Sequence, residues 1–432
     1  MITRVGPLLI ILPLIFRHYE VSAFTVLRTT KIRESFLFVG EYLTSDLTTA
    51  FNATNSISFQ GYPSSDDWFS DPKIDDDDNE DKSEISSYEF LTANRVDKPS
   101  DLEVLESADL AYPFAGMLRN SAPYIADHSH RTAVFYLPGE YMDTPNINSD
   151  LGDICLAWLL GLKIVLVVGC RFDNDGCNVD FGNEIECVNA IGVTDDDLLR
   201  KVEEEAGFIR FEIERVLNRH LKHHGGISSG FSDQGDANGN VVGGTFYTAR
   251  PFGVIDHVDY KNTGYPSKIY TERIEACLNN NDIVLLSTIG TSRLGDVVNV
   301  NGNHLAATVA AALKARKLVF LSNSGTIMRE KGSPKTMQEM PLKFAKLLLK
   351  HYGVLINQAG FVAFKRKHDS LDQGAIELLL HLAWSTWALD QGVNRAHIVN
   401  PGDGSLLEEL FSSKLGVNTC LYREDEAEDL DL

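Results

Sequence analysis

The chain has 432 residues, of which 44% are hydrophobic and 23% are charged, and its net charge at pH 7 is −22. This is the composition of a globular protein, and the negative balance argues against nonspecific binding to nucleic acid or to an anionic membrane, since both need clustered lysine and arginine. Half of the negative excess lies between Asp66 and Glu106, where fifteen acids face four bases. The remainder is therefore only mildly acidic.

Residues 1–23 are typical of a signal peptide. The apolar run from Val5 to Phe16 is too short to span a bilayer, and Ala23 suits the last position before a signal-peptidase cleavage site. Residues 24–45 begin with Phe24 and are rich in basic and hydroxyl side chains, which resembles the transit part of the bipartite presequences of algae with complex plastids. We therefore expect a plastid (chloroplast) protein with no membrane segment in its mature form. An ordinary secretory signal is the alternative.

Residues 46–102 are polar, with the sequence DDDDNEDKSE at their centre, and residues 423–432 are again acidic. Such segments cannot bury enough apolar surface to offset the entropy of ordering, so we expect a disordered acidic linker and an acidic tail. The six cysteines show no C-x-x-C spacing, which favours reduced thiols. The cluster His220, His223 and His224 has no acidic or cysteine partner in register, so we expect no metal site.

From residue 103 onwards, helical and apolar strand patterns alternate. Helices are predicted over 103–128, 150–162 and 194–221, and in the first part of 299–321. Pro113 and Pro123 interrupt the first, Gly161 closes the second, and Thr194 is the expected N-cap of the third. Continuous apolar strands are predicted over 132–140, 163–170, 281–290 and 315–325. This pattern predicts an α/β fold with a mostly parallel central sheet covered by helices on both faces.

Ligands of such sheets bind beyond the carboxyl ends of the strands, where we expect the loops 137–140, 169–174 and 299–303. None of these loops matches the Rossmann or P-loop glycine pattern. The glycine-rich stretch 225–254 predicts a β-hairpin or a lid, and the basic amphipathic stretch 331–354 predicts a surface helix packed on the domain.

Six segments in order carry a resemblance to a known family: 114–140, 153–171, 193–199, 253–264, 299–325 and 392–419. They resemble the amino-acid kinase fold, and more closely the kinase-like domain of N-acetylglutamate synthase, which begins arginine biosynthesis. We assign this domain to residues 103–422. A related enzyme, acetylglutamate kinase, transfers phosphate from ATP to N-acetylglutamate. Its chemistry needs lysines to neutralise the phosphate and an acid to organise them.

The resemblance places other residues where those groups are expected. Tyr136 stands at the first-strand lysine, Pro138-Gly139 at the Gly-Gly turn, and Asn303 at the organising aspartate. Gly192 stands where the kinase has an arginine that grips a substrate carboxylate. The late lysine, expected near the start of the helix that begins at Gly374, is missing, because residues 375–400 contain no lysine.

One feature is of the synthase type and another is shared with the kinase. The second loop keeps Gly169 and continues with Cys170 and Arg171 as in the synthase, and Asn299 retains the substrate-side asparagine. We therefore interpret Tyr136, Gly139, Gly169, Arg171, Asn299 and Asn303 as vestigial substrate and phosphate loops, with phosphoryl transfer lost. A divergent acetylglutamate kinase is one alternative.

In synthases of this type, acetyl-CoA and glutamate react in a C-terminal acetyltransferase domain of the GNAT fold, for which this sequence shows no pattern after residue 422. We therefore assign no catalytic residue and no cofactor, with acetyl-CoA as a substrate only if such a domain or a separate acetyltransferase partner is present. A non-catalytic arginine-sensing or scaffold subunit is a further alternative.

The resemblance also implies a homo-oligomer and L-arginine as a feedback effector, bound between the N-terminal helix and residues 390–411. Arginine needs carboxylates or carbonyls for its guanidinium and backbone N–H groups for its carboxylate. The candidate residues are Trp387, Asp390, Gly392, Asp403 and Glu408.

Overall fold

A computed structural model describes residues 113–171, 187–188, 191–228, 239–255, 257–327, 336–364, 373–402, 404–411 and 418–424. All of them belong to one compact unit that spans residues 59–432. The expected signal peptide, transit segment and acidic linker lie outside the described residues, as does almost all of the acidic tail.

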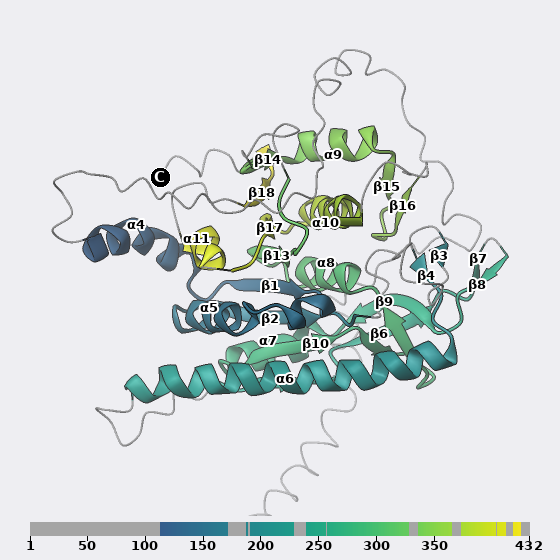
Figure 1. Cartoon of the computed structure of the whole chain (residues 1–432), viewed down its shortest axis with the longest axis horizontal. Coiled ribbons are helices and arrows are strands. Elements are labelled where there is room, and N and C mark those ends of the chain that lie inside the picture. Colours follow the sequence, from purple (N-terminus) through teal and green to yellow (C-terminus); the bar gives the residue numbers. More distant parts are fainter. Residues whose placement is uncertain are drawn as a thin grey trace, which may run out of the picture. The chain divides into compact units, whose positions relative to one another are not determined.

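Eight strands form the central sheet in the order β14, β18, β17, β13, β1, β2, β10, β5 (Figure 1). Neighbouring strands are parallel except for the antiparallel pair β17 and β18. The predicted mostly parallel sheet is therefore confirmed. The strand bounds are β14 Glu339–Pro341, β18 Thr419–Tyr422, β17 Arg395–Val399, β13 Lys317–Leu321, β1 Thr132–Leu137, β2 Lys163–Val168, β10 Ile283–Ser287 and β5 Val241–Gly243.

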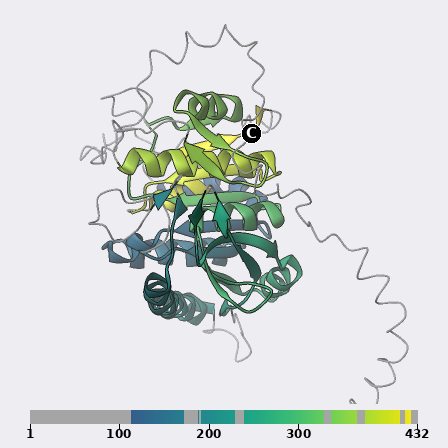
Figure 2. The same cartoon turned by 90° about the vertical axis from the view of Figure 1, so that its right-hand side faces the viewer.

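Helices cover both faces of this sheet. One face carries α5 (Ile147–Leu159), α6 (Asp196–Ser228) and α11 (Ser405–Phe411), and α4 (Pro113–His128) contacts α11. The other face carries α7 (Thr271–Asn279), α8 (Gly302–Ala312) and α10 (Gln373–Asp390), with α9 (Leu342–His351) packed on α10. In Figure 2, α6 is seen nearly end-on, on the opposite side of the sheet from α9 and α10. Among the described residues, no helix is both long and apolar enough to cross a membrane.

A small closed barrel adjoins the sheet, with its strands in the order β11, β12, β9, β6. Their bounds are β11 Ile289–Thr291, β12 Val297–Val300, β9 Thr263–Ile269 and β6 Tyr247–Pro251. Three short antiparallel pairs complete the described strands: β3 (Cys187–Val188) with β4 (Ile191–Gly192), β7 (Val254–Ile255) with β8 (Val258–Asp259), and β15 (Val354–Ile356) with β16 (Val362–Phe364).

The central strand β1 shows why the sequence folds in this way. Its residues 133–137 are all buried, and successive side chains alternate between the two cores. Phe135 enters the core under α5 and α6, whereas Tyr136 enters the core under α8 and α10. A strand buried on both faces has no reason to alternate apolar and polar residues, which explains the continuous apolar runs in the sequence.

Two details differ from the expectations. Helix α6 begins at Asp196, and Asp195 caps it by accepting a 2.8 Å hydrogen bond from the Leu198 N–H, so Thr194 as N-cap was wrong. Helix α4 starts at Pro113, which suits a first helical position, and continues through Pro123 instead of breaking there. Gly161 closes α5 with a φ of +100°, as expected.

The two stretches of uncertain type are now assigned. In the glycine-rich stretch 225–254, β5 joins the edge of the central sheet while β6 joins the barrel, so these strands do not pair as a hairpin. Residues 229–238 of that stretch lie outside the described residues. Helix α9 buries Leu342, Ala345 and Leu348 against the domain, which confirms a packed surface helix within the predicted range 331–354. The helix is shorter than predicted, because residues 339–341 form strand β14.

Candidate functional site

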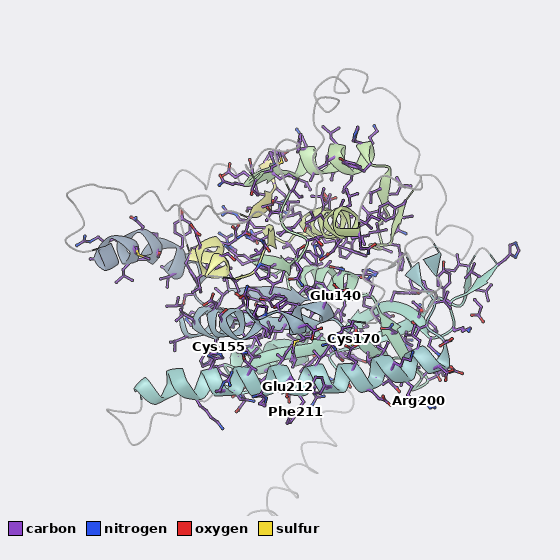
Figure 3. The ribbon with its side chains drawn as sticks, viewed as in Figure 1. Glu140, Cys155, Cys170, Arg200, Phe211 and Glu212 are labelled. Atoms are coloured by element: carbon purple, nitrogen blue, oxygen red, sulfur yellow. The ribbon has the colours of Figure 1, made fainter. Side chains whose placement is uncertain are left out.

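The first two predicted loops meet at the carboxyl ends of β1 and β2. The Gly169 N–H donates a 2.8 Å hydrogen bond to the Leu137 carbonyl, and Gly139 begins the short 3-10 helix η2 (Gly139–Asp143). A Cβ atom on Gly139 would lie 2.2 Å from the carbonyl carbon of Cys170 and 2.4 Å from the Arg171 nitrogen. Only glycine fits here, because the two loops touch through their backbones. Figure 3 labels Glu140 and Cys170, which mark this edge of the sheet.

Tyr136, at the position of the expected lysine, is fully buried beneath the start of α8. Its ring lies against Gly302 and meets Phe320 edge-on, with 5.9 Å between the ring centroids. His381 of α10 stacks on Phe320 at 5.0 Å. The Tyr136 hydroxyl has no hydrogen-bond partner among the described residues. Tyr136, Phe320 and His381 therefore form a buried aromatic cluster between β1, β13 and α10.

A half-buried acid, Glu377, lies in the first turns of α10. Its carboxylate accepts hydrogen bonds from the hydroxyls of Ser322 (3.4 Å) and Ser324, which follow β13. Burial raises the pKa of Glu377, and the nearby carboxylate of Glu140 adds to the rise. Burial lowers the pKa of the neighbouring His381 to about 3, so its imidazole is neutral. The start of α10, where the resemblance implies a lysine, thus carries the carboxylate of Glu377 with that of Glu140 nearby.

Arg171 of the second loop is bound to two carboxylates. Its guanidinium donates to both oxygens of Asp143 at 2.8 and 2.6 Å and to Glu205 of α6 at 2.5 Å. The Arg171 backbone N–H also donates to Glu205, at 3.1 Å. This bidentate arrangement holds the second loop against η2 and α6. In this conformation the guanidinium is occupied by the protein's own carboxylates.

The third loop, between β12 and α8, is organised by polar side chains. The Asn299 amide donates to the Thr194 hydroxyl at 3.2 Å, and the Thr194 N–H donates to the Thr263 hydroxyl at 2.8 Å. Asn301 caps α8 by accepting a 2.9 Å hydrogen bond from the His304 N–H. Sequence reasoning missed this cap, although an asparagine just before a helix is its usual signal.

The side-chain carbonyl oxygens of Asn299 and Asn303 are buried and have no partner among the described residues. A cavity of about 30 Å³ lies beside this loop, with His304 and Phe361 among its lining residues. That volume holds one or two water molecules but not an amino acid or a nucleotide, since ligand pockets are typically about 300–1,000 Å³. The loops keep their architecture, while the space next to them is largely filled.

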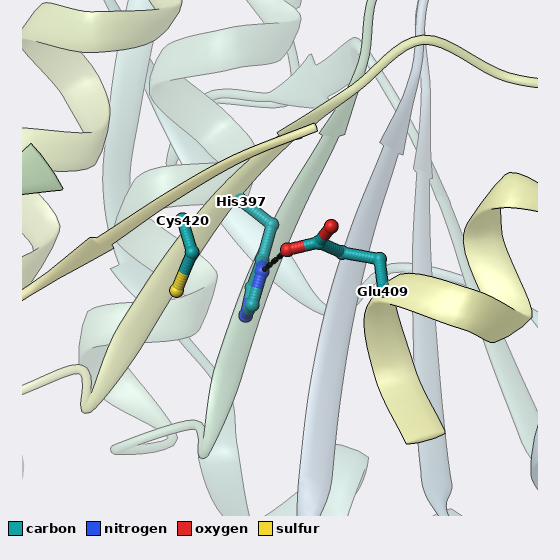
Figure 4. Close-up of side chains that lie close together, drawn as sticks. All are labelled: His397, Glu409 and Cys420. Atoms are coloured by element: carbon teal, nitrogen blue, oxygen red, sulfur yellow. Dashed lines mark hydrogen bonds and ion pairs between the residues drawn. The ribbon is translucent and has the colours of Figure 1, made fainter. Parts of the chain in front are cut away.

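His397, Glu409 and Cys420 are the one group of potential metal ligands that the described residues bring together (Figure 4). His397 Nδ1 lies 2.8 Å from Glu409 Oε1, and burial lowers the pKa of His397 to about 4, so a neutral imidazole donates to the carboxylate. Lys317, fully buried beside them, adds a positive charge that opposes a bound cation. We interpret the group as an internally paired network rather than a metal centre. Of the expected histidine cluster, the side chains of His223 and His224 lie outside the described residues.

Comparison with known proteins identifies the domain. Residues 139–341 match the amino acid kinase family. The chain carries an amino acid kinase family domain. It is 32% identical to the amino-acid acetyltransferase of Aeromonas salmonicida over 316 residues, which cover 73% of this chain and 64% of that protein. The chain thus spans less than two thirds of the length of this relative.

A solved structure gives the same result for the fold. The N-acetylglutamate synthase of Neisseria gonorrhoeae, complexed with coenzyme A and N-acetyl-glutamate, superposes with a TM-score of 0.58 at 28% identity, covering 72% of this chain and 64% of that one. Its complex with coenzyme A and L-arginine superposes with a TM-score of 0.57 at the same identity, covering 72% and 65%. The predicted resemblance to the kinase-like domain of N-acetylglutamate synthase is therefore confirmed.

The four arginine candidates within the described residues do not come together. Trp387 of α10 is buried edge-on to His304 of α8, and its indole N–H donates to the Gln358 carbonyl at 3.0 Å. Asp390, at the end of α10, pairs with Lys346 at 2.8 Å, and Gly392 follows with a φ of +100°.

Glu408 lies on α11, on the opposite face of the sheet from α10, and its side chain is exposed. Helix α11 packs beside α4, with the rings of Phe411 and His128 5.9 Å apart. Asp403 lies outside the described residues. The candidates therefore form two separate groups, and only the α11 group adjoins the N-terminal helix that the resemblance implies for the effector site.

Proposed function

We propose that this chain is the kinase-like, regulatory part of an N-acetylglutamate synthase of L-arginine biosynthesis. The complete protein would transfer the acetyl group of acetyl-CoA to the amino group of L-glutamate, giving N-acetyl-L-glutamate and coenzyme A. The observation that carries the proposal is the similarity, across nearly three quarters of this chain, to proteins named amino-acid acetyltransferase. The fold shared with the gonococcal synthase supports it independently.

We infer that the domain no longer transfers phosphate. A kinase site must neutralise the charge of the transferred phosphoryl group, and losing one preorganised cation or donor costs roughly 100- to 1,000-fold in rate. Here Tyr136 and Asn303 stand where a lysine and its organising aspartate are expected, and Glu377 adds a half-buried carboxylate whose pKa is raised by desolvation. The loss of several groups at once leaves too little charge stabilisation for phosphoryl transfer.

Acetyl transfer is assigned to an acetyltransferase domain, either continuous with this chain or carried by a separate partner. The purified chain tests this assignment directly. We expect no ATP-dependent phosphorylation of N-acetylglutamate, and no release of coenzyme A from acetyl-CoA and glutamate until an acetyltransferase domain is supplied. Phosphorylation above background would refute the loss of kinase chemistry. Acetyl transfer by this polypeptide alone would refute the assignment of acetyl transfer to a separate acetyltransferase domain.

We further propose that the domain binds L-arginine as an effector beside α11. The gonococcal synthase has been solved with L-arginine, which supports arginine as the ligand class. Glu408 is an exposed carboxylate on the helix that packs against α4, whereas Asp390 is already paired with Lys346. Isothermal titration should give a heat of binding for L-arginine that Glu408→Gln weakens and Asp390→Asn leaves unchanged. The reverse ranking would move the site to the end of α10.

We also propose a plastid location, based on residues 1–45. These residues fused to a fluorescent protein should direct it to the plastid in an alga with a complex plastid, and deletion of residues 24–45 should divert it to the secretory pathway. Secretion of the undeleted fusion would favour the ordinary signal peptide instead.

A further inference from the structure

Helix α9 carries a row of lysines on its outer face. Lys343, Lys346 and Lys350 are exposed and are spaced three and four residues apart, so they lie on one side of the helix. The ten residues of α9 contain no acid, although the whole chain has a net charge of −22. In Figure 1, α9 runs along the outer margin of the domain, next to β14 and β18. This face is therefore a positive surface on an acidic protein.

One of the three lysines is already paired within the domain. Lys346 Nζ lies 2.8 Å from a carboxylate oxygen of Asp390, at the end of α10. The side chains of Lys343 and Lys350 form no ion pair with any other residue that the structure describes. Carboxylates that lie outside the described residues can therefore pair with these two lysines.

The chain leaves strand β18 beside the beginning of α9. Strand β18 runs parallel to β14, with Tyr422 beside Pro341, and α9 begins at the next residue, Leu342. The Lys343 backbone N–H donates a 3.2 Å hydrogen bond to Glu424 Oε1. Helix α9 has no acid in its first turn and no side-chain cap of its own, so Glu424 supplies the negative charge that a helix N-terminus favours. The residues that follow Glu424 thus start at one end of the lysine row.

Residues 425–432, the rest of the acidic tail, have the charge and the length to cover this row. They lie outside the described residues, and five of their eight side chains are carboxylates. Eight extended residues span up to about 26 Å, whereas a helix of ten residues is about 15 Å long, so both Lys343 and Lys350 are within reach. Exposed ion pairs are individually weak. Because the tail is tethered, however, its effective concentration is on the order of millimolar, and several weak pairs are then sufficient.

We propose that residues 425–432 dock along the outer face of α9, with their carboxylates against Lys343 and Lys350. Residues 66–106 carry more negative charge, but they precede α4, which contacts α11 on the opposite face of the sheet from α9. The acidic tail, by contrast, is bound to the start of α9 through Glu424. Docking fixes the path of the chain after β18 and uses no residue of the candidate site.

Carbodiimide cross-linking of the full chain, which joins lysines directly to carboxylates, tests the proposal when it is followed by peptide mass spectrometry. An equal mixture of unlabelled and isotope-labelled chain separates links within one copy from links between copies. We expect Lys343 or Lys350 to be linked to residues 425–432 within one copy, with a yield that falls at least about fivefold in about 1 M salt. The control is Lys222, an exposed lysine of α6 on the opposite face of the sheet, which should give no link to these residues.

Three results of this experiment would overturn the proposal. They are links from the α9 lysines only to residues 66–106, links only between copies, and no link from α9 to any carboxylate of the tail. The first of these would identify the acidic segment before α4 as the occupant of the lysine row instead.

A charge variant tests the docking without a cross-linker. A protease that cleaves before aspartate should cut residues 425–432 at least about threefold faster in Lys343→Glu with Lys350→Glu, because cleavage follows the population of the undocked tail. Both substitutions are at exposed positions, so the fold is kept. Lys222→Glu is the matched control and should leave the cleavage rate unchanged. A cleavage rate that the α9 double variant does not raise would contradict the docking.

Discussion

Tyr136 of β1 packs directly against Gly302, the first residue of α8. A Cβ atom on Gly302 would lie 2.5 Å from Tyr136 Cε2 and 3.0 Å from the hydroxyl oxygen. The bulky ring and the missing side chain therefore depend on each other, and together they join the first strand to the helix that follows the asparagine loop. The contact between β1 and the start of α8 is therefore tightly packed.

Gly302→Ala should destabilise the domain by about 1–3 kcal/mol, because the new methyl group must displace a buried ring that has little room to move. Urea unfolding followed by tryptophan fluorescence measures the change. The matched control is Gly116→Ala in α4, where an added Cβ would meet no atom within 4 Å. That variant should gain about 0.5–1 kcal/mol from helix propensity. Equal effects at both positions would show that the Tyr136 contact does not limit residue 302.

Tyr136→Phe should leave the free energy of unfolding unchanged or raise it by up to about 1 kcal/mol. The hydroxyl is buried and has no partner among the described residues, so its removal relieves a desolvation cost and keeps the ring contacts with Phe320 and His381. Denaturant unfolding of the wild-type protein and the variant under the same conditions measures this difference in the free energy of unfolding. A loss of more than about 1 kcal/mol would mean that the hydroxyl makes a strong hydrogen bond, for example to an ordered water.

Glu377→Gln should stabilise the domain increasingly as the pH rises. Burial raises the pKa of Glu377 above the ordinary glutamate value of 4.5, so the folded state holds the proton more tightly than the unfolded state does. The carboxyl therefore does not lower the free energy of unfolding below pH 4.5. Above that pH it lowers the free energy of unfolding increasingly, until the pH reaches the folded-state pKa.

The glutamine keeps the size and the acceptor oxygen for Ser322 and Ser324 but does not ionise. The stability difference between variant and wild type should increase above pH 4.5 by at most about 1.4 kcal/mol per pH unit and then level off. The same substitution at Glu272, an exposed acid on α7, serves as the control. A difference that stays constant with pH would rule out the raised pKa.

Arg171→Met should cost about 2–4 kcal/mol of folding stability, mainly because it leaves Glu205 buried without its cation. The side chain of Glu205 is 8% exposed and that of Asp143 is 65% exposed, so the two partners of Arg171 should differ sharply. Asp143→Asn should cost less than about 1 kcal/mol, as is usual for exposed ion pairs.

A double-mutant cycle of Arg171→Met with Glu205→Gln, measured by urea unfolding, checks this assignment. The double variant should lose less than the sum of the single variants, because it removes the buried charge together with its partner. Additive losses would show that Arg171 and Glu205 act independently.

Much of the fold could be predicted from the sequence because its signals are local. The apolar runs that became β1, β2, β10 and β13 are continuous, and glycines such as Gly161 end the helices where a positive φ is needed. The assignment of Thr194 as N-cap failed because Asp195 is an equally good cap one residue later. Thr194 is instead drawn into hydrogen bonds with Thr263 and Asn299, which are distant in sequence and whose approach no local pattern reveals.

The candidate site could be predicted only in part, for the same reason. Tyr136 could be singled out from the sequence because the resemblance implies a lysine at its position, and this assignment stays a prediction. The role of Glu377 could not be singled out in this way, since its pKa depends first on desolvation and then on Ser324, Glu140 and Ser322, and these act only after β13 and α10 have packed. The arginine candidates were grouped because they are near one another in the sequence, but β17 lies between Asp390 and Glu408 and places them on opposite faces of the sheet.

The sequence by itself determined the order of helices and strands, the parallel sheet and the family, because hydrophobic period and motif order are properties of the chain read one segment at a time. Only the tertiary structure decided which side chains share a space. It placed Tyr136 on Gly302, joined Arg171 to Asp143 and Glu205, and brought Glu424 to the start of α9. Those relationships depend on burial and on contacts between distant segments, which exist only after the layers have packed.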